Sequence, residues 1–156
     1  LQAFGVEVAK VRRSPGPGEL GADEWRARLG EFDWVIVAVP ATPETDGMIG
    51  GAEWAAMKGD AVLVNVARGS VVDQQALGAS LTEGRIAGAL LDVTSPEPLP
   101  PEHPLWEIER AHVTMHLSGQ ALRWAFKLSA ERFLDNLARY RIGDALTPLV
   151  DYSRGY

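Results

Sequence analysis

The sequence of 156 residues predicts an α/β fold, a doubly wound parallel sheet with helices packed on both of its faces. Short apolar runs rich in β-branched residues alternate with segments of helical periodicity, and this alternation is typical of right-handed crossovers between parallel strands. The runs at 34–39 and 61–66 are apolar nearly throughout, as is usual for strands buried on both faces. The length is that of one domain.

Five segments are predicted to form strands because they are short, apolar and rich in β-branched residues. They are "VEVAKV" (6–11), "WVIVAV" (34–39), "AVLVNV" (61–66), "IAGALLDV" (86–93) and "HVTM" (112–115). The proline-rich stretches at 15–17 and 96–104 are predicted to be loops.

Helical segments fall between these runs. "DEWRARLG" places Trp25 and Leu29 four residues apart, and "GAEWAAMKG" predicts a short helix. "DQQALGASLTEG" runs from Asp73, a suitable N-cap, to Gly84, a suitable C-terminal residue. The opening "LQAFG" is typical of a last helical turn closed by Gly5.

The longest predicted helix follows Gly119. Its apolar side chains recur at intervals of three and four residues and would form one stripe along the helix. They are Leu122, Phe126, Ala130, Phe133, Leu137 and Tyr140. Such a stripe predicts contact with the core or with another subunit.

The composition excludes several classes of function. A net charge of −6 without a Lys/Arg-rich stripe argues against a nucleic-acid surface. The absence of cysteine excludes a disulfide framework, a thiolate metal site and a cysteine nucleophile, and it fits a reducing compartment. No apolar run approaches the roughly 18 residues of a membrane span. We therefore expect a cytoplasmic protein with no nucleic-acid, membrane or metal partner.

Polar residues that follow the predicted strands should meet at one edge, because ligands of doubly wound sheets bind at the carboxyl ends of the strands. Arg68 and Gly69 follow the third run, Glu97 lies a few residues beyond the fourth, and His116 directly follows the fifth. Singly, each has an ordinary explanation: a solvated loop arginine, a polar loop residue and a hydrogen-bonded core histidine. Together they suit a specific chemical task.

An arginine presents a permanently charged planar fork that grips a carboxylate. A histidine exchanges protons near neutral pH, and a glutamate bonded to it favours its protonated form. Arg68, Glu97 and His116 together could therefore hold a 2-oxo acid and protonate its carbonyl oxygen. The hydride for the reduction would come from a cofactor.

Four segments in order resemble signatures of the D-isomer-specific 2-hydroxyacid dehydrogenases, in the C-terminal part of their dinucleotide-binding domain. They are "VAVPATPETDGMIG", "MKGDAVLVNVARGSVVDQQAL", "GRIAGALLDVTSPEPLPPEHPLW" and "HVTMHLSG". The ending "LVDYSRGY" is similar to that of the glyoxylate/hydroxypyruvate-reductase-like branch. The resemblance implies a Rossmann-like sheet, a small 2-oxo or 2-hydroxy acid substrate and NAD(P) as cofactor.

The resemblance also implies roles for individual residues. The catalytic arginine, glutamate and acid/base histidine of the family fall on Arg68, Glu97 and His116. The implied cofactor-binding positions include these Arg and His residues together with Pro40, Thr45, Val66, Ala67, Asp92, Ser118 and Gly119, where Asp92 meets the nicotinamide amide. Two positions depart from the family pattern: Met115 stands where proline is usual, and Thr94 replaces a common aromatic residue.

The residues after the first predicted strand predict a preference for NADP(H) over NAD(H). An acid at the end of the second strand of a dinucleotide fold bonds the adenosine ribose and selects NAD. Here that position reads "VRRSP", so Arg12, Arg13 and Ser14 would face a 2′-phosphate instead. The alternative is that both arginines are solvated loop charges.

By resemblance the first strand and the glycine-rich loop are lacking, so we expect residues 1–142 to form a partial dinucleotide-binding domain. Residues 143–156 would be a tail returning toward a substrate domain. The five strands would form a pair, 6–11 with 34–39, and a separate triplet, unless a direct pairing of 6–11 with 61–66 closes the gap. We expect little or no activity from such a fragment alone.

Members of the family are commonly homodimers, and we expect the same here through "PLPPEHPLW" (98–106) and the helix after Gly119. Two alternatives stay open. The family also contains corepressors that sense the dinucleotide and bind partner peptides without turnover. A degenerate remnant that keeps only the subunit contact is the third possibility, which the intact Arg68, Glu97 and His116 disfavour.

Overall fold

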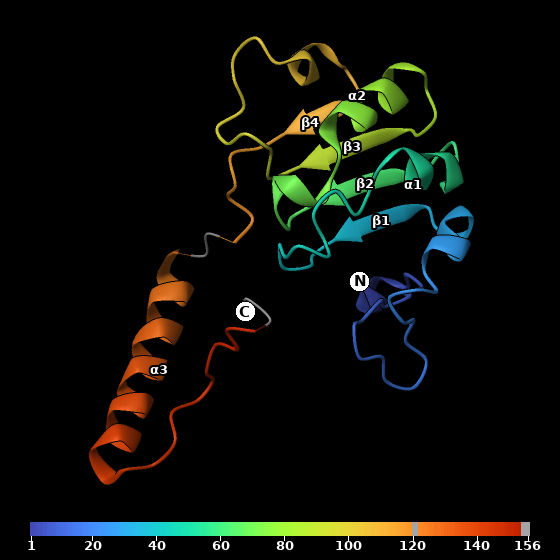
Figure 1. Cartoon of the computed structure of the whole chain (residues 1–156). Helices are drawn as coiled ribbons and strands as arrows, with labels where there is room; N and C mark the ends of the chain where they lie inside the picture. The colour runs from blue at the N-terminus through green and yellow to red at the C-terminus, as the bar shows by residue number, and fades with distance from the viewer. Residues whose placement is uncertain (120–121, 154–156) are drawn as a thin grey trace.

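The computed structural model of the chain describes residues 1–119 and 122–153; Gln120, Ala121 and 154–156 lie outside the described residues. Its centre is a four-stranded parallel sheet in the order β1-β2-β3-β4 (Figure 1). The strands are β1 (Trp34–Val37), β2 (Val62–Asn65), β3 (Gly88–Leu91) and β4 (Ala111–Val113). Each strand is hydrogen-bonded to the next along the chain, which confirms the predicted parallel α/β class.

The strands end level with one another. Val37 is paired with Asn65, Asn65 with Leu91, and Leu91 with Val113. The residues that follow each strand therefore leave the sheet at the same edge, and this edge carries the candidate site.

Two of the helices form in segments that the sequence predicts to be helical. α1 (Gly51–Ala56) and α2 (Gln74–Thr82) connect the strands, and the Asp73 side chain caps α2 by accepting the N–H of Ala76 at 2.9 Å. Gly84 ends this segment with a φ of +69°, a conformation that glycine adopts without steric cost. The chain also forms short 3-10 helices: η1 (Gln2–Phe4), η2 (Arg26–Glu31), η3 (Gly69–Val71) and η4 (Pro104–Glu107). Within the predicted helical segment 23–30, the structure has a 3-10 helix that begins only at Arg26, and residues 23–25 form a turn.

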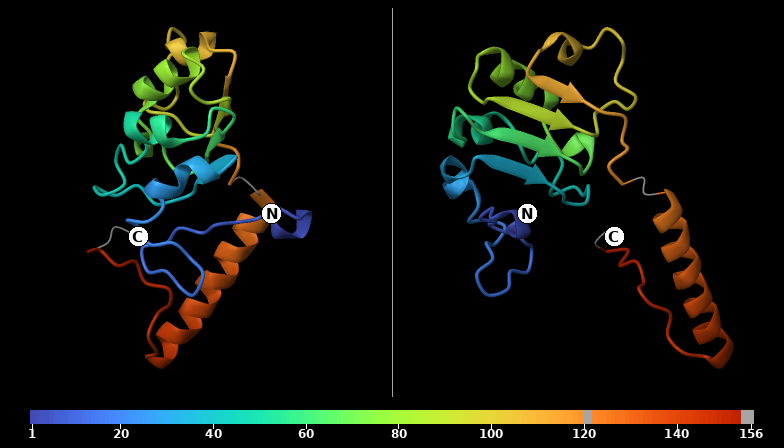
Figure 2. Two further views of the ribbon diagram at one scale, coloured as in Figure 1. Left: turned by 90° about the vertical axis from the view of Figure 1, so that its right-hand side faces the viewer. Right: turned by 180° about the vertical axis from the view of Figure 1, so that it is seen from behind.

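The core lies between one face of the sheet and the helices α1 and α2 (Figures 1 and 2). Alternate strand residues point into it, including Leu63, Ala89 and Leu91, which are fully buried. Trp54 of α1 and Leu77 of α2 supply the opposing side chains. This packing sets the orientation of the sheet edge relative to α2.

The opposite face of the sheet is bare in the described part of the chain. Trp34, Ile36 and Leu90 are exposed there, and the left view of Figure 2 shows α1 and α2 on one side of the sheet only. The expectation of helices on both faces therefore holds for one face. Apolar composition alone could not distinguish a sheet covered on both faces from one covered on a single face, because it indicates what a face can bury and not what covers it.

Residues 6–11 do not form the predicted strand. They lie in an irregular segment joined to the following loop by a single bridge between Val11 and Leu20. The division into a pair and a triplet is also wrong, since β1 pairs directly with β2. A strand persists only where a neighbouring strand satisfies its backbone groups, and none of the four strands described above pairs with this segment. Val6 and Val11 therefore stay exposed.

The last helix, α3 (Leu122–Ile142), leaves the sheet, and the following tail runs back along it (Figure 1). The Thr147 N–H donates to Asn136 Oδ1 at 3.0 Å and fixes this return. The predicted stripe is exposed at Phe126, Phe133 and Tyr140, so it is not part of the core; the side chain of Leu122 lies outside what is described. Contact of the stripe with another subunit stays a prediction.

Candidate active site

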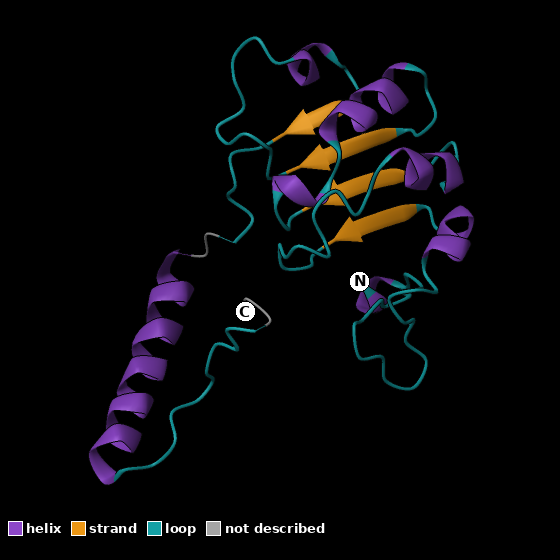
Figure 3. Ribbon diagram, viewed as in Figure 1, coloured by secondary structure: helices purple, strands orange, loops and turns teal. Residues whose placement is uncertain are grey.

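The carboxyl ends of the four strands lie at one edge of the sheet (Figure 3), and the predicted chemical groups belong to the segments that follow these ends. Arg68 follows β2, Glu97 lies in the loop between β3 and η4, and His116 follows β4. Because these strands are neighbours and end in register, three segments distant in sequence converge on one side of the sheet.

Glu97 and His116 are in direct contact. His116 Nδ1 lies 2.7 Å from Glu97 Oε1, and both side chains are about 40% exposed. An ionised carboxylate only accepts hydrogen bonds, so Nδ1 carries the hydrogen of this bond. Nε2 is then the nitrogen left to exchange a proton with a bound molecule.

His116 has an unusual backbone conformation. Its φ is +53°, the only positive value at a non-glycine position in the described part of the chain. Such a conformation costs on the order of 1–3 kcal/mol and persists only where the surroundings hold it. The His116 N–H donates to the Asp92 carbonyl at 2.8 Å, which ties the strained residue to the end of β3.

The Asp92 side chain holds the rest of this turn. Its carboxylate accepts the N–H groups of Leu117 and Ser118, each at 3.0 Å, and the hydroxyl of Thr114. Hydrogen bonds from Ser118 and then Thr114 hold the pKa of Asp92 well below its usual range, although burial opposes the shift. The carboxylate thus stabilises the turn that presents His116. Its predicted contact with a nicotinamide amide stays a prediction.

Arg68 stands apart from the other two in this structure. Its Nη1 donates to the Ala67 carbonyl at 2.6 Å, so the guanidinium is folded back onto its own backbone. Among the described residues, no ion pair or hydrogen bond joins it to Glu97 or His116. Buried Asn65 shapes the turn by accepting the Ala67 N–H and donating to the Arg68 carbonyl, both at 3.0 Å.

A close contact with Thr94 requires that the residue after Arg68, Gly69, be a glycine. A Cβ atom at Gly69 would lie 2.0 Å from the carbonyl carbon of Thr94, far inside any real contact. The turn after β2 is therefore pressed against the loop that carries Glu97. This contact joins two of the three predicted catalytic segments.

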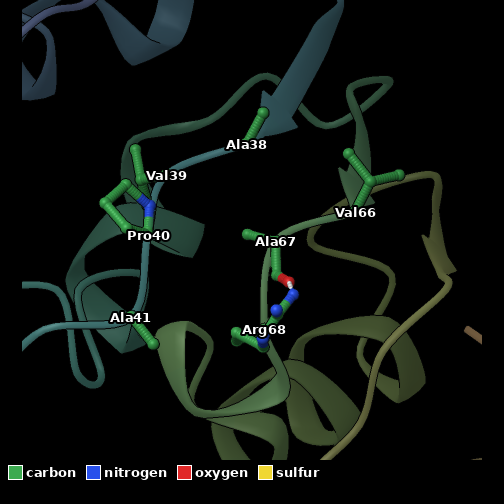
Figure 4. A pocket seen from close by; sticks show the side chains of 7 residues that line it. All are labelled: Ala38, Val39, Pro40, Ala41, Val66, Ala67 and Arg68. Atoms are coloured by element: carbon green, nitrogen blue, oxygen red, sulfur yellow. Dashed lines mark hydrogen bonds between the residues drawn. The ribbon is translucent and has the colours of Figure 1, made fainter. Parts of the chain in front are cut away.

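A hollow of about 430 Å³ lies between the carboxyl ends of β1 and β2 (Figure 4). It is lined by small apolar residues and by Arg68: Ala38, Val39, Pro40, Ala41, Val66, Ala67 and Arg68. The predicted cofactor residues Pro40, Val66, Ala67 and Arg68 are all among them. Thr45 is not among the lining residues, but its hydroxyl donates to the Pro40 carbonyl at 2.8 Å and supports the loop.

Asp92 and Ser118 lie in a second hollow, on the bare face of the sheet. Val66 lines both hollows, so the two are adjacent. The predicted residue Gly119 is exposed beside Ser118, with open space around its Cα. This places six predicted cofactor positions, Pro40, Val66, Ala67, Arg68, Asp92 and Ser118, along one continuous surface.

Arg12 and Arg13, which are predicted to bind a 2′-phosphate, are both paired with acids. Arg12 Nε is 3.4 Å from Glu19, and Arg13 Nη2 is 3.6 Å from Glu44, which belongs to the loop that begins at Pro40. Ser14 is exposed next to them. The Gly16 N–H, helped by Arg12 and Lys10, lowers the pKa of Glu19. Both arginines are about half exposed or more and open to a ligand.

Sequence reasoning did not identify Asn65, Gln74 and Thr114 as part of the site. Asn65 had a visible signal, because it interrupts the apolar run "AVLVNV". Gln74 had none, since a glutamine in a first helical turn is ordinary. No group of His, Asp and Glu in the described residues could hold a metal ion, and no described helix is long and apolar enough to cross a membrane.

Comparison with known proteins agrees with this geometry. The family model described as "D-isomer specific 2-hydroxyacid dehydrogenase, NAD binding domain" matches residues 1–118. A glyoxylate reductase of Korarchaeum cryptofilum is 37% identical over 155 residues, which cover 96% of this chain and 46% of that protein. The chain spans about half the length of the curated relatives it matches.

Two solved structures show the same fold with different cofactors. An NADPH-dependent glyoxylate/hydroxypyruvate reductase of Sinorhizobium meliloti, in complex with NADP and sulfate, superposes with a TM-score of 0.87 at 28% identity, covering 99% of this chain and 51% of that one. A D-lactate dehydrogenase of Lactobacillus jensenii with NAD+ gives a TM-score of 0.81 at 26% identity, covering 96% and 50%.

Proposed function

Because the chain belongs to the D-isomer specific 2-hydroxyacid dehydrogenase family, we propose that it carries the cofactor-binding and acid–base residues of an oxidoreductase that reduces a small 2-oxo acid with NAD(P)H. The contact of 2.7 Å between Glu97 and His116 is the observation that carries this proposal. A carboxylate that fixes one imidazole nitrogen leaves the other to act as a general acid.

Each residue then has a defined task. The reduced nicotinamide, when bound, supplies a hydride to the carbonyl carbon. His116 gives its Nε2 proton to the carbonyl oxygen, while Glu97 holds the ring from Nδ1. Arg68 grips the substrate carboxylate once its guanidinium leaves the Ala67 carbonyl, a movement within reach of a flexible exposed side chain.

Small substrates of the glyoxylate and hydroxypyruvate type are favoured by the relatives. The protein of K. cryptofilum is described as a glyoxylate reductase, and that of S. meliloti as a glyoxylate/hydroxypyruvate reductase. The hollow between β1 and β2 is lined by small apolar residues and suits the nicotinamide end of a dinucleotide. The comparisons reported above give no support to a corepressor without turnover.

We place the adenosine end of the cofactor at Arg12, Arg13 and Ser14, with NADP(H) preferred over NAD(H). The ion pair of Arg13 with Glu44 brings this segment to the loop that lines the hollow. Two guanidinium groups offer charge-assisted hydrogen bonds to a 2′-phosphate. Since the relatives include both an NADP and an NAD+ complex, the family alone does not decide the preference.

The remaining proposals concern the whole protein. Residues 1–142 would serve as the dinucleotide-binding part and 143–156 as a connecting tail. A homodimer through 98–106 and α3 is supported by the exposed apolar stripe of α3. The cytoplasmic location expected from the lack of cysteine stays a prediction.

The first test compares NADPH and NADH binding to the wild-type chain and to Arg12→Asp. Thermal melts and fluorescence titration should show tighter binding of NADPH to the wild type. Arg12→Asp should lower the NADPH/NADH affinity ratio roughly tenfold or more, because a hydrogen bond to a charged group contributes about 1.5–3 kcal/mol.

Arg85→Asp is the matched control. Arg85 is also exposed and paired with a neighbouring glutamate, Glu83, but it lies outside the site. An unchanged ratio in Arg12→Asp would refute the cofactor preference. A folded wild-type chain that binds neither dinucleotide would refute the proposal that residues 1–142 serve by themselves as the dinucleotide-binding part.

A further inference from the structure

Gln74, the first residue of α2, is bonded twice to the backbone of Ser95. Its Nε2 donates to the Ser95 carbonyl at 2.6 Å, and its Oε1 accepts the Ser95 N–H at 2.9 Å. The side-chain amide thus satisfies both backbone groups of Ser95, as a neighbouring strand would. The side chain of the next residue, Gln75, is exposed and makes no hydrogen bond to the described residues.

Ser95 belongs to the loop that carries Glu97. Gly69 presses against Thr94 on one side of Ser95, and the Thr94 hydroxyl donates to the Pro96 carbonyl at 2.9 Å. Glu97 itself extends from this loop to His116. The position of the carboxylate therefore depends on how the backbone at 94–96 is held.

The helix α2, from which Gln74 makes these bonds to Ser95, is held rigidly by the core. α2 buries Leu77 and Leu81 almost completely in the core, and Asp73 caps its first turn. Gln74 projects from that fixed turn to a partly exposed loop. A bond made from a rigid element restricts the loop more than a bond within the loop would.

We propose that Gln74 is a positioning residue, which anchors Ser95 so that Glu97 reaches His116 Nδ1. The role rests on the proposed function, because it concerns the same acid–base pair. It requires a side chain that donates and accepts at once, which an amide does and a carboxylate does not. A glutamate at this position would face the Ser95 carbonyl with a second acceptor and lose that bond.

Gln74→Glu tests the role, with Gln75→Glu as the matched control. Both variants add one negative charge in the first turn of α2, so both change its charge in the same way. Only Gln74→Glu removes a hydrogen bond to Ser95. Gln74→Met, which keeps the length of the side chain without any donor or acceptor, serves as a second variant if Gln74→Glu does not fold.

The readout is the pair of ¹⁵N ring shifts of His116, which report the nitrogen that carries the proton. His116→Gln assigns these signals, and Glu97→Gln gives their position when the ionic partner is lost. The other histidines, His103 and His112, serve as internal controls for the fold. A purely structural role of Gln74 would lower stability without moving the His116 ring signals.

In Gln74→Glu or Gln74→Met the His116 signals should move more than half of the way to their Glu97→Gln positions. In Gln75→Glu they should coincide with the wild type. Folded Gln74 variants with wild-type His116 signals would overturn the inference alone. If Glu97→Gln itself leaves the signals unchanged, the acid–base pair is absent, and both the proposed function and this inference fail.

Discussion

At the scale of single residues, the site depends on one strained histidine and the carboxylate that holds it. His116 adopts a positive φ that a histidine tolerates only under restraint. Asp92 supplies the restraint through Leu117, Ser118 and Thr114. The two residues that depart from the family pattern, Thr94 and Met115, lie close in sequence to Asp92 and His116 respectively. Met115 is exposed, so its side chain adds little to the restraint.

Asp92→Asn should therefore lower the free energy of unfolding by about 1–3 kcal/mol at pH 7, the usual cost of unsatisfied buried groups. Leu117 and Ser118 donate to different oxygens of Asp92, so the amide nitrogen of asparagine would face one of these two N–H donors and leave it without an acceptor. Urea unfolding measures the change. Asp23→Asn, at an exposed carboxylate, is the control and should change stability little.

The difference between wild type and Asp92→Asn should also depend on pH. Because folding lowers the pKa of Asp92, its contribution is complete above the unfolded value of about 3.9 and is lost as the pH falls through the folded value. The free energies of unfolding of the wild type and of Asp92→Asn should become more alike as the pH falls from about 5 to about 2. A gap that is constant over this range would contradict the assigned role of the carboxylate.

At the scale of elements, the site is built where two loops touch. The turn after β2 carries Arg68, the loop after β3 carries Glu97, and Gly69 allows them to meet at Thr94. The same loop is bonded to α2 through Gln74. The geometry of the candidate site is therefore a property of packed segments as well as of the residues on them.

Gly69→Ala should lower the free energy of unfolding by roughly 1–3 kcal/mol, because the added methyl group must push the two loops apart. Gly51→Ala is the control: it has open space around its Cα, lies in α1, and should be neutral or stabilising by up to about 1 kcal/mol. Chemical denaturation compares the two. Equal effects of both substitutions would show that the contact with Thr94 is unimportant.

At the scale of the whole molecule, two apolar surfaces lack a partner in the described chain. One is the outer face of the sheet, with Trp34, Ile36 and Leu90, and the other is the stripe of α3. Full burial of a large apolar side chain stabilises by about 1.5–3 kcal/mol, so association that covers either surface is favoured.

The chain should therefore associate in a concentration-dependent way, and Phe133→Gln should weaken this association. Phe133 lies in the α3 stripe and is 66% exposed, so its loss leaves the fold of the sheet intact. Arg132→Gln, at the exposed position directly before Phe133 in α3, is the control. Sedimentation equilibrium distinguishes the variants. If both variants associate as the wild type does, the α3 stripe is not the contact surface.

The sequence by itself determined four of the strands, which it predicts at 34–39, 61–66, 86–93 and 112–115 and which form at 34–37, 62–65, 88–91 and 111–113. It also determined the capped helix α2 and the edge that carries Arg68, Glu97 and His116. These follow from periodicity, capping residues and the rule that parallel strands end at one edge, all of which depend on neighbours along the chain. Four ordered motifs added the family.

Only the tertiary structure decided the rest. The exposed segment 6–11, the direct pairing of β1 with β2 and the bare face of the sheet depend on which partner is present, not on local composition. The bond of Gln74 to Ser95 and the folded-back Arg68 depend on loop positions across the sheet. Local preferences act over a few residues, whereas a hydrogen bond between distant segments exists only once packing has brought them together.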